Sequence, residues 1–344
     1  MKNFTTKAIL IFLFITGFSF SQTANAQKLT ALVSNGVTTM YGSASQFTDA
    51  YNAATTGDTI YLPGGPIAPV TIDKSIAIYG AGYHPDSTQA TSATYLTSGI
   101  VFNQNADSAS ITGVEVNGSI TTSYNHKVDY LVISRCDVKS INIYGNASTP
   151  CTHVTIKECV IRGGIGLSGA TYSNISNNIV ETTVSDGSNN AIYNNIFLYN
   201  RATVNYTVYY LFSRVNNSHI ANNIIFEEHA LSSCNTNTLE NNIFRNTPSG
   251  GTNIFIGNYY NVDLSTVFVN QTGNTFDFAH DYNLVSPATY QGFDATEVGI
   301  YGGLHPFKDG GLPNNPHVQT KDIAIQTDSN GDLHIEIKVA AQDK

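Results

Sequence analysis

The chain has 344 residues, with 16 Lys and Arg against 25 Asp and Glu, for a formal net charge of −9. Charged residues make up only 12%, about half the usual share, whereas Asn occurs 37 times and Trp does not occur. Apolar residues are too plentiful for a disordered chain, and the composition is not that of a coiled coil or helical repeat. No basic run offsets the negative charge, so we expect no nucleic-acid partner.

Residues 1–26 have the pattern of a secretory signal peptide. Lys2 and Lys7 give a positive start, and residues 8–20 form an apolar run that is short for a membrane span. The Ala-Asn-Ala sequence that ends at Ala26 is a small-x-small cleavage site. We therefore predict export to the periplasm, cell surface or medium, with no membrane span in the mature chain. An uncleaved membrane anchor is the less favoured alternative.

Residues 27–55 are expected to cap the N-terminal end of the fold. Within them Phe47, Ala50 and Tyr51 lie at helical spacing. A helix there would cover the open end of a repeat array, which solenoids require for solubility.

The middle of the chain repeats a six-residue pattern whose first and sixth positions are always apolar. The units recur at steps of 17 to 28 residues, and a period near twenty indicates a solenoid. Each unit is too short for two helices and is rich in Ile, Val, Thr and Tyr, which favours strands. We therefore predict an all-β parallel β-helix over residues 56–290. The fourth position of each unit is occupied in turn by Val114, Cys136, Cys159, Asn178, Asn195, Asn223 and Asn242.

Stacking of the coils would place these fourth positions in a column, about 4.8 Å from one coil to the next. Buried Asn amides in such a column can donate to and accept from each other. The first and sixth positions both face inward although they differ by an odd number, so the strand must bend between them. We expect the bend at the column Asn, which tolerates left-handed backbone. The third position, with Arg135 and Glu158, is expected to face outward; a mere surface turn of Asn residues is the alternative.

Two of the four cysteines, Cys136 and Cys159, share this column in neighbouring coils. Export permits a disulfide between them, but stacked strands seldom have disulfide geometry, so we favour two small buried thiols. With Cys151 and Cys234, the spacings match no zinc pattern, and we expect no metal site.

A candidate ligand site comes from two adjacent coils and the long loop between them. Equivalent offsets after the column would place Arg201 over His229 and Tyr199 over Glu227. Tyrosine rings beside Arg and carboxylates suit a sugar-binding groove, and a solvated ladder of ion pairs is the plainer alternative. A second outward column of Lys139, Arg162 and Glu181 is interpreted as a solvated ladder of ion pairs with loop packing. The residues expected to contact ligand are Tyr199, Arg201, Tyr206, Tyr209, Glu227 and His229.

The Gly-Asp-Thr-Ile-Tyr-Leu-Pro-Gly sequence at 57–64, the Asn-Asn-Ile units and Ser-Pro-Ala at 286–288 resemble secreted right-handed parallel β-helix proteins of the pectate-lyase-like superfamily. The tail at 298–303 and 306–313 is similar to an exported bacterial subgroup without settled activity. The resemblance implies a right-handed coil. It also implies relatives that act on acidic polysaccharides, the lyases among them with Ca²⁺ held by carboxylates. The Trp-containing pectate-lyase motif and the polygalacturonase motifs Asn-Thr-Asp, Asp-Asp and Gly-His-Gly are absent from the sequence.

The function expected from these features is binding of extracellular carbohydrate, a polysaccharide or surface glycan. A polysaccharide lyase or hydrolase is the first alternative, and a structural or adhesive surface module is the second. No cofactor is expected, except Ca²⁺ if the chain is a lyase. Residues 291–344 are expected to form a Gly- and Pro-rich segment with a closing strand at 333–339.

Overall fold

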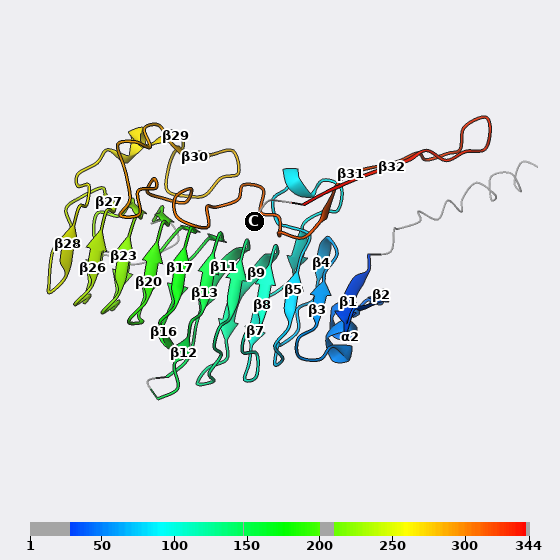
Figure 1. Ribbon diagram of the computed structural model, residues 1–344, viewed down its shortest axis with the longest axis horizontal. Helices are drawn as coiled ribbons and strands as arrows, with labels where there is room; N and C mark the ends of the chain where they lie inside the picture. Colours follow the sequence, from blue (N-terminus) through cyan, green and yellow to red (C-terminus); the bar gives the residue numbers. More distant parts are fainter. Residues whose placement is uncertain (1–27, 147, 200–209, 342–344) are drawn as a thin grey trace, which may run out of the picture.

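The computed structural model describes residues 28–146, 148–199 and 210–341, so the predicted signal peptide lies outside the described residues. The chain forms an all-β parallel β-solenoid of about nine turns with very little helix, which confirms the predicted fold class. Figure 1 shows the coils stacked side by side from β3 at one end to β28 at the other. None of the helices in the described part is long and apolar enough to cross a membrane.

Two long sheets form the walls of the coil. The first runs in the order β2 (Val37–Tyr41), β1 (Thr30–Ser34), β3 (Thr59–Tyr61), β5 (Ala77–Tyr79), β8 (Ser110–Thr112), β10 (Val132–Ser134), β13 (Thr155–Lys157), β17 (Asn174–Ser176), β20 (Ala191–Tyr193), β23 (His219–Ala221), β26 (Thr238–Glu240) and β28 (Ile254–Ile256).

The second sheet contains β4 (Gly65–Ile67), β6 (Thr94–Leu96), β7 (Ile100–Phe102), β9 (Glu115–Thr122), β11 (Asp137–Asn142), β14 (Val160–Ile161), β15 (Ile165–Gly166), β18 (Ile179–Val180), β19 (Val184–Ser185), β21 (Ile196–Phe197), β22 (Phe212–Ser213), β24 (Ile224–Ile225), β25 (Leu231–Ser232) and β27 (Ile243–Phe244). A short parallel pair, β12 (Cys151–Thr152) and β16 (Ala170–Thr171), lies apart from both sheets.

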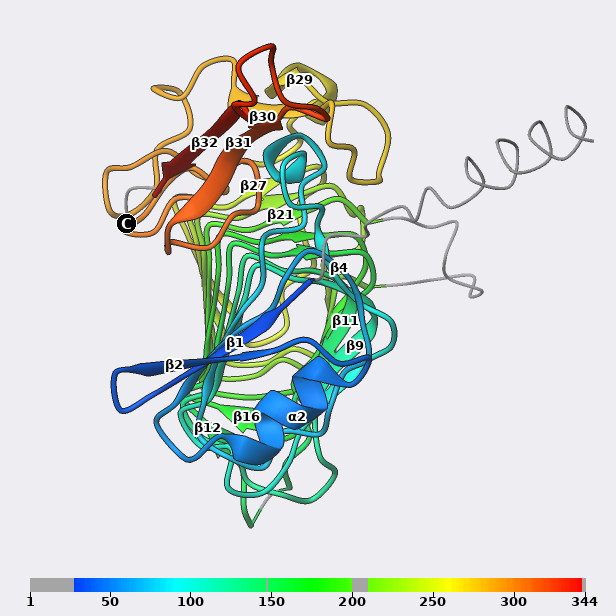
Figure 2. The same ribbon diagram turned by 90° about the vertical axis from the view of Figure 1, so that its right-hand side faces the viewer.

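The N-terminal end carries the one α-helix of the described residues, α2 (Gln46–Ala53), which packs against β1 and β2. Figure 2, which looks along the coil, shows α2 and β1 lying across its end. Phe47, Ala50 and Tyr51 are buried and belong to the same continuous core as the first coils. The helical spacing read from the sequence therefore corresponds to the face of α2 that joins the core.

The first and sixth positions of the repeat face the interior, as predicted. Ile111, Ile133 and Ile156 occupy equivalent positions in neighbouring strands and are fully buried, and the column continues through β17, β20, β23 and β26. Because each coil repeats the same apolar positions, the core is one stacked aliphatic column along the axis of the solenoid.

The bend lies one residue earlier than predicted. Left-handed backbone occurs at the third position, as at Arg135 (φ 50°), Glu158 (φ 55°) and Asn177 (φ 55°), and not at the column Asn. The physical reason is the reversal of side-chain direction at a left-handed residue, which turns the following side chain into the coil. The first Asn of each Asn-Asn pair makes the bend, and the second enters the interior.

The predicted Asn ladder is confirmed and extends one coil further. Each column amide donates from Nδ2 to the Oδ1 of the next, over 2.9–3.0 Å, in the order Asn178, Asn195, Asn223, Asn242 and Asn258. A second ladder, absent from the sequence prediction, follows another turn and includes Asn190, Ser218, Asn237 and Asn253. These bonds satisfy buried amides that hydrophobic packing alone would leave without partners.

All four cysteines are buried and free. Cys136 and Cys159 occupy the Asn column as thiols, which agrees with the interpretation favoured above. Cys159 joins the ladder through its backbone N–H, which donates to Asn178 Oδ1 over 3.0 Å. Burial raises the pKa of the Cys159, Cys151 and Cys234 thiols, so they are poor nucleophiles in the folded protein.

The parallel coil ends earlier than residue 290, because β28 is the last strand to pair in parallel. The following residues fold on the outside of the coil. They form the 3₁₀ helix η3 (Leu264–Thr266) and the antiparallel pair β29 (Phe268–Asn270) and β30 (Asp281–Leu284). The expected closing strand is β32 (Ile335–Ala340), which pairs with β31 (His317–Ile323) in an exposed hairpin that projects from the coil (Figure 1).

Residues 291–313, here called the C-terminal strap, run back along the outside of the coil toward its N-terminal end (Figure 1). The strap binds the outward third position of one coil after another. Asn241 and Asn177 donate from Nδ2 to its carbonyls, Asn222 Oδ1 accepts from its Phe293 N–H, and Arg135 donates to Leu312 O over 2.9 Å. The third positions do face outward, as predicted, but the strap covers them.

Candidate functional site

The structure separates the residues predicted to contact ligand. Arg201, Tyr206 and Tyr209 lie outside the described residues. Tyr199 is 1% exposed and belongs to the core, and Glu227 is 3% exposed, with Oε1 accepting from the His229 backbone N–H over 3.0 Å.

His229 is exposed, and the ring next to it is that of Tyr210, with centroids 5.9 Å apart. Tyr199, Glu227 and His229 line none of the three cavities described below, which are formed by other side chains. The half of the predicted cluster that the structure describes is therefore part core and part open surface.

Arg162 and Glu181 do pair and a loop packs over them, as interpreted from the sequence, but the column is not solvated at these two residues. Lys139 is exposed, but Glu181 is buried and Arg162 is only half-exposed. The cause is the segment at 276–278, which lies over this column: Phe276 N–H donates to Glu181 Oε1 over 2.9 Å, and Arg162 Nη1 donates to Phe276 O over 3.1 Å.

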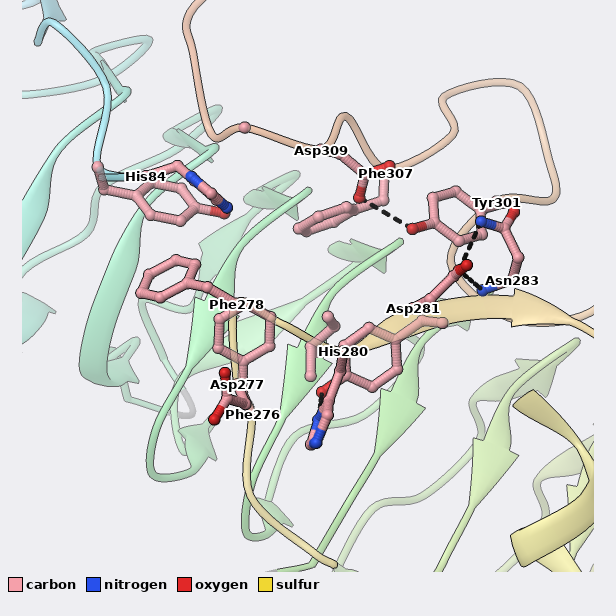
Figure 3. Close-up of a pocket in the computed structure, with 14 residues that line it drawn as sticks. His84, Phe276, Asp277, Phe278, His280, Asp281, Asn283, Tyr301, Phe307 and Asp309 are labelled. Atoms are coloured by element: carbon pink, nitrogen blue, oxygen red, sulfur yellow. Dashed lines mark hydrogen bonds between the residues drawn. The ribbon is translucent and has the colours of Figure 1, made fainter. Parts of the chain in front are cut away.

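This segment, the loop around His84 and the strap enclose two adjoining cavities of about 260 and 460 Å³, here called the acidic groove. The cavities share Tyr83 and Phe278. Figure 3 shows the side chains of the smaller cavity, which come from these three segments and from β30. Its lining includes Asp277, His280, Asp281, Tyr301 and Asp309.

Arg162 holds the floor of the groove together. Its Nε and Nη2 donate to the two carboxylate oxygens of Asp137 over 3.0 and 2.7 Å, in the bidentate geometry that guanidinium favours. Its Nη1 lies 3.6 Å from Glu181 Oε1, and its guanidinium carbon is 4.8 Å from the centre of the Phe276 ring. Burial lowers the pKa of Arg162, but Asp137 and Glu181 outweigh this and raise it, so the residue is a fixed positive charge.

Glu115 lies beside this ion pair. It occupies the position in β9 that pairs with Asp137 in β11. The two carboxylates therefore extend from neighbouring strands, whose backbones are spaced about 4.8 Å, and both residues line the larger cavity. Burial raises the pKa of the Glu115 carboxyl, and the negative charge of Asp137 raises it further, while Arg162 opposes the shift. Two adjacent carboxyl groups thus have different environments, one tied to a guanidinium and the other inclined to hold a proton.

Aromatic rings and hydrogen-bonding groups line the smaller cavity. The His84 ring lies edge-on to Phe278 with centroids 4.6 Å apart, and Tyr301 donates to Asp309 Oδ1 over 2.9 Å (Figure 3). Burial raises the pKa of Tyr301, and Asp309 adds to the effect, so the hydroxyl stays protonated. The result is a groove of ring surfaces with carboxylate acceptors between them.

Within the described ranges, no group of three or more His, Cys, Asp or Glu side chains is placed to hold a metal ion. The groove presents carboxyl, imidazole, phenol and aromatic groups. Comparison of the chain with protein-family models, curated proteins and solved structures finds no match.

Sequence reasoning missed the groove because its walls come from outside the repeat. One signal was present in the fifth position of each unit, which points outward and yet is apolar at Val160, Ile179 and Ile196. These side chains form a second core with Val298 and Ile300 of the strap. Apolar side chains at outward positions predict a segment that covers them. In the first two units the fifth position is a carboxylate instead, Glu115 and Asp137, and this change marks where the groove lies.

Proposed function

We propose that the protein is exported and binds extracellular carbohydrate in the acidic groove, as a β-helix protein of the pectate-lyase-like kind that its sequence resembles. The observation that carries this proposal is the combination of exposed ring surface at Phe278 with the acceptors Asp277, Asp281 and Asp309 around one cavity. Carbohydrates offer apolar ring faces and many hydroxyl donors, which such a lining complements.

The charge of the groove favours neutral glycans over polyuronates. Among the described residues, Arg162 is the only Lys or Arg in the linings of its two cavities, and Asp137 already occupies its guanidinium. A uronate carboxylate would therefore meet several like charges without a free cation, which costs several kcal/mol in such a setting. This differs from the acidic substrates that the resemblance implies.

A glycan array probed with the mature chain tests the proposal, followed by calorimetric titration of the best ligand. Phe278→Ala should weaken binding about tenfold or more, because the ring supplies stacking area. Phe293→Ala is the matched control, since Phe293 is a similarly exposed ring on the strap outside the groove. Equal affinity of the two variants, or binding restricted to polyuronates, would contradict the proposal.

A glycoside hydrolase is the second candidate, and the Glu115–Asp137 pair is the observation that favours it. Glu115 has a raised pKa and Asp137 is bonded to a guanidinium, and two carboxyl groups in such different environments are the arrangement that separates acid from base in these enzymes. Paired positions on strands spaced about 4.8 Å suit the retaining reaction, whose two carboxyl groups stand about 5 Å apart. In this reaction Glu115 would protonate the glycosidic oxygen while Asp137 attacks the anomeric carbon, and water would then hydrolyse the glycosyl-enzyme with Glu115 as base. Glu115→Gln should then abolish release of reducing sugar and preserve binding, whereas an unsaturated product would indicate a lyase instead.

A further inference from the structure

A third cavity, of about 450 Å³, lies at the N-terminal end of the coil and is here called the N-terminal pocket. It is formed by strands β3 and β5, by residues 28–29 and by the chain from Pro313 into β31. Thr91 lines this pocket while Ser92 lines the acidic groove, so one loop separates the two. A volume of this size accommodates a small organic ligand.

The charge of the N-terminal pocket is opposite to that of the acidic groove. Among the residues that the structure describes, its lining contains Lys28, Lys321 and His317 but no Asp or Glu. Lys28 folds back onto the protein, since a Cβ placed on Gly65 would lie only 2.0 Å from its Nζ. In a chain with a net charge of −9, a cavity whose described lining combines two ammonium groups with no carboxylate is suited to an anion.

Two polar atoms at the N-terminal pocket have no hydrogen-bond partner. Asn315 Oδ1 and His317 Nδ1 are both buried and unpaired, and both residues line the cavity. A buried polar atom without a partner costs about 1–3 kcal/mol, so native proteins satisfy most such atoms with protein groups, water or a ligand. Hydroxyl groups of a ligand, which both donate and accept, would supply the missing partners.

The remaining lining is flat and largely apolar. Tyr61 and Tyr79 occupy paired positions in β3 and β5, and their rings stack with centroids 5.5 Å apart and planes 18° from parallel. Pro313 and Pro316 add rigid apolar surface. Stacked tyrosines beside prolines suit the carbon face of a sugar ring.

We propose that the N-terminal pocket binds a sugar acid, independently of the acidic groove. Lys28 and Lys321 would contact the carboxylate, Asn315 and His317 the hydroxyls, and the tyrosine pair the ring. The ligand class is set by all three requirements together, because a simple anion leaves the two buried polar atoms unpaired and a neutral sugar leaves the ammonium groups without a partner.

Calorimetric titration of the full chain at low salt tests this site, with glucuronate as the probe. Its methyl ester keeps the hydroxyls and removes the charge, and acetate keeps the charge and removes the hydroxyls. We expect glucuronate to bind at least tenfold more tightly than either. A glucuronate trimer distinguishes the source: tighter binding of the trimer indicates the end of a polyuronate, and equal binding indicates a free sugar acid.

Lys28→Ala and Lys321→Ala should each weaken glucuronate binding about tenfold, because both side chains are exposed enough to be removed without unfolding. Lys338→Ala in the projecting hairpin is the matched control, and Phe278→Ala should leave glucuronate affinity unchanged even where it abolishes glycan binding in the acidic groove. No saturable heat, equal binding of the methyl ester, or wild-type affinity in both lysine variants would overturn the proposal.

Discussion

Replacing Asn195 by Ala in the middle of the Asn ladder should be among the most destabilising single changes in this protein. Asn195 is fully buried, and its Oδ1 accepts from both the backbone N–H and the Nδ2 of Asn178. Its Nδ2 donates to Ile175 O, to Tyr193 O and to Asn223 Oδ1. Alanine removes all five bonds and leaves a space between coils that water cannot readily enter.

The size of the effect follows from which groups keep another partner. Asn178 Nδ2 still donates to Ile156 O, and Asn223 Oδ1 still accepts from the backbone N–H of residue 195. The Asn178 N–H loses the acceptor it has in the ladder, and a buried orphan of this kind costs about 1–3 kcal/mol. Together with the weakened bonds and the cavity, we expect a loss of about 3–5 kcal/mol in the free energy of unfolding.

Urea unfolding followed by far-ultraviolet circular dichroism measures this loss, since the chain has no Trp for fluorescence. Asn258→Ala is the matched control. Asn258 accepts the same pair of bonds from Asn242 but ends the ladder and is partly exposed, so water can replace it at a cost of about 1 kcal/mol. If the two variants lose stability equally, the ladder is not a buried network and the reasoning fails.

Three further predictions concern charge and thiols. Glu115→Gln should make the protein more stable at pH 7 than the wild type and similar at pH 4. The folded-state pKa of Glu115 is raised, so the wild type loses stability as the pH rises past the unfolded-state value, and equal pH profiles in urea unfolding would contradict this. Glu158→Ala should lower the free energy of unfolding by about 3–5 kcal/mol, because Arg135 would stay buried without the carboxylate that it bonds over 2.6 Å. Replacing both residues by Met should be close to neutral in thermal unfolding, and similar losses of stability in the two variants would refute this. Ellman's reagent should find no reactive thiol in the native protein and all four after denaturation, and any shortfall in the denatured count would reveal a disulfide among Cys136, Cys151, Cys159 and Cys234.

The coil could be predicted because each position of the repeat occurs in several units of the sequence. The inward columns and the Asn ladder followed from comparing these units, since a residue that is ambiguous in one coil can be assigned from the equivalent residues of its neighbours. The bend was misplaced by one residue because Asn fills both the third and fourth positions in four of the units, and only the three earlier units, with Gly113, Arg135 and Glu158, have another residue at the third.

The groove could not be predicted in the same way. Phe276 and Phe278 occur once, in a stretch that reads like further coil, and their contacts with Arg162 join residues more than a hundred positions apart. The outward columns showed that Arg162 and Glu181 share a face, but nothing repeated in the sequence indicated what would cover them. Periodicity predicts the repeated coils, whereas the segments that enclose the groove occur once in the sequence and lie outside the repeat.

The strap has a consequence for how the protein folds. Neighbouring rungs bond across separations of about twenty residues, so the coil can grow one turn at a time from local contacts. The strap instead joins residues 50 to 177 positions apart, and its partners exist as one outward row only after several coils have formed. We therefore expect the strap to dock after the coils it binds, with the Arg135–Glu158 pair in contact with water until then. A chain cut off before residue 291 would contain every rung of the coil and yet remain unsealed along one side.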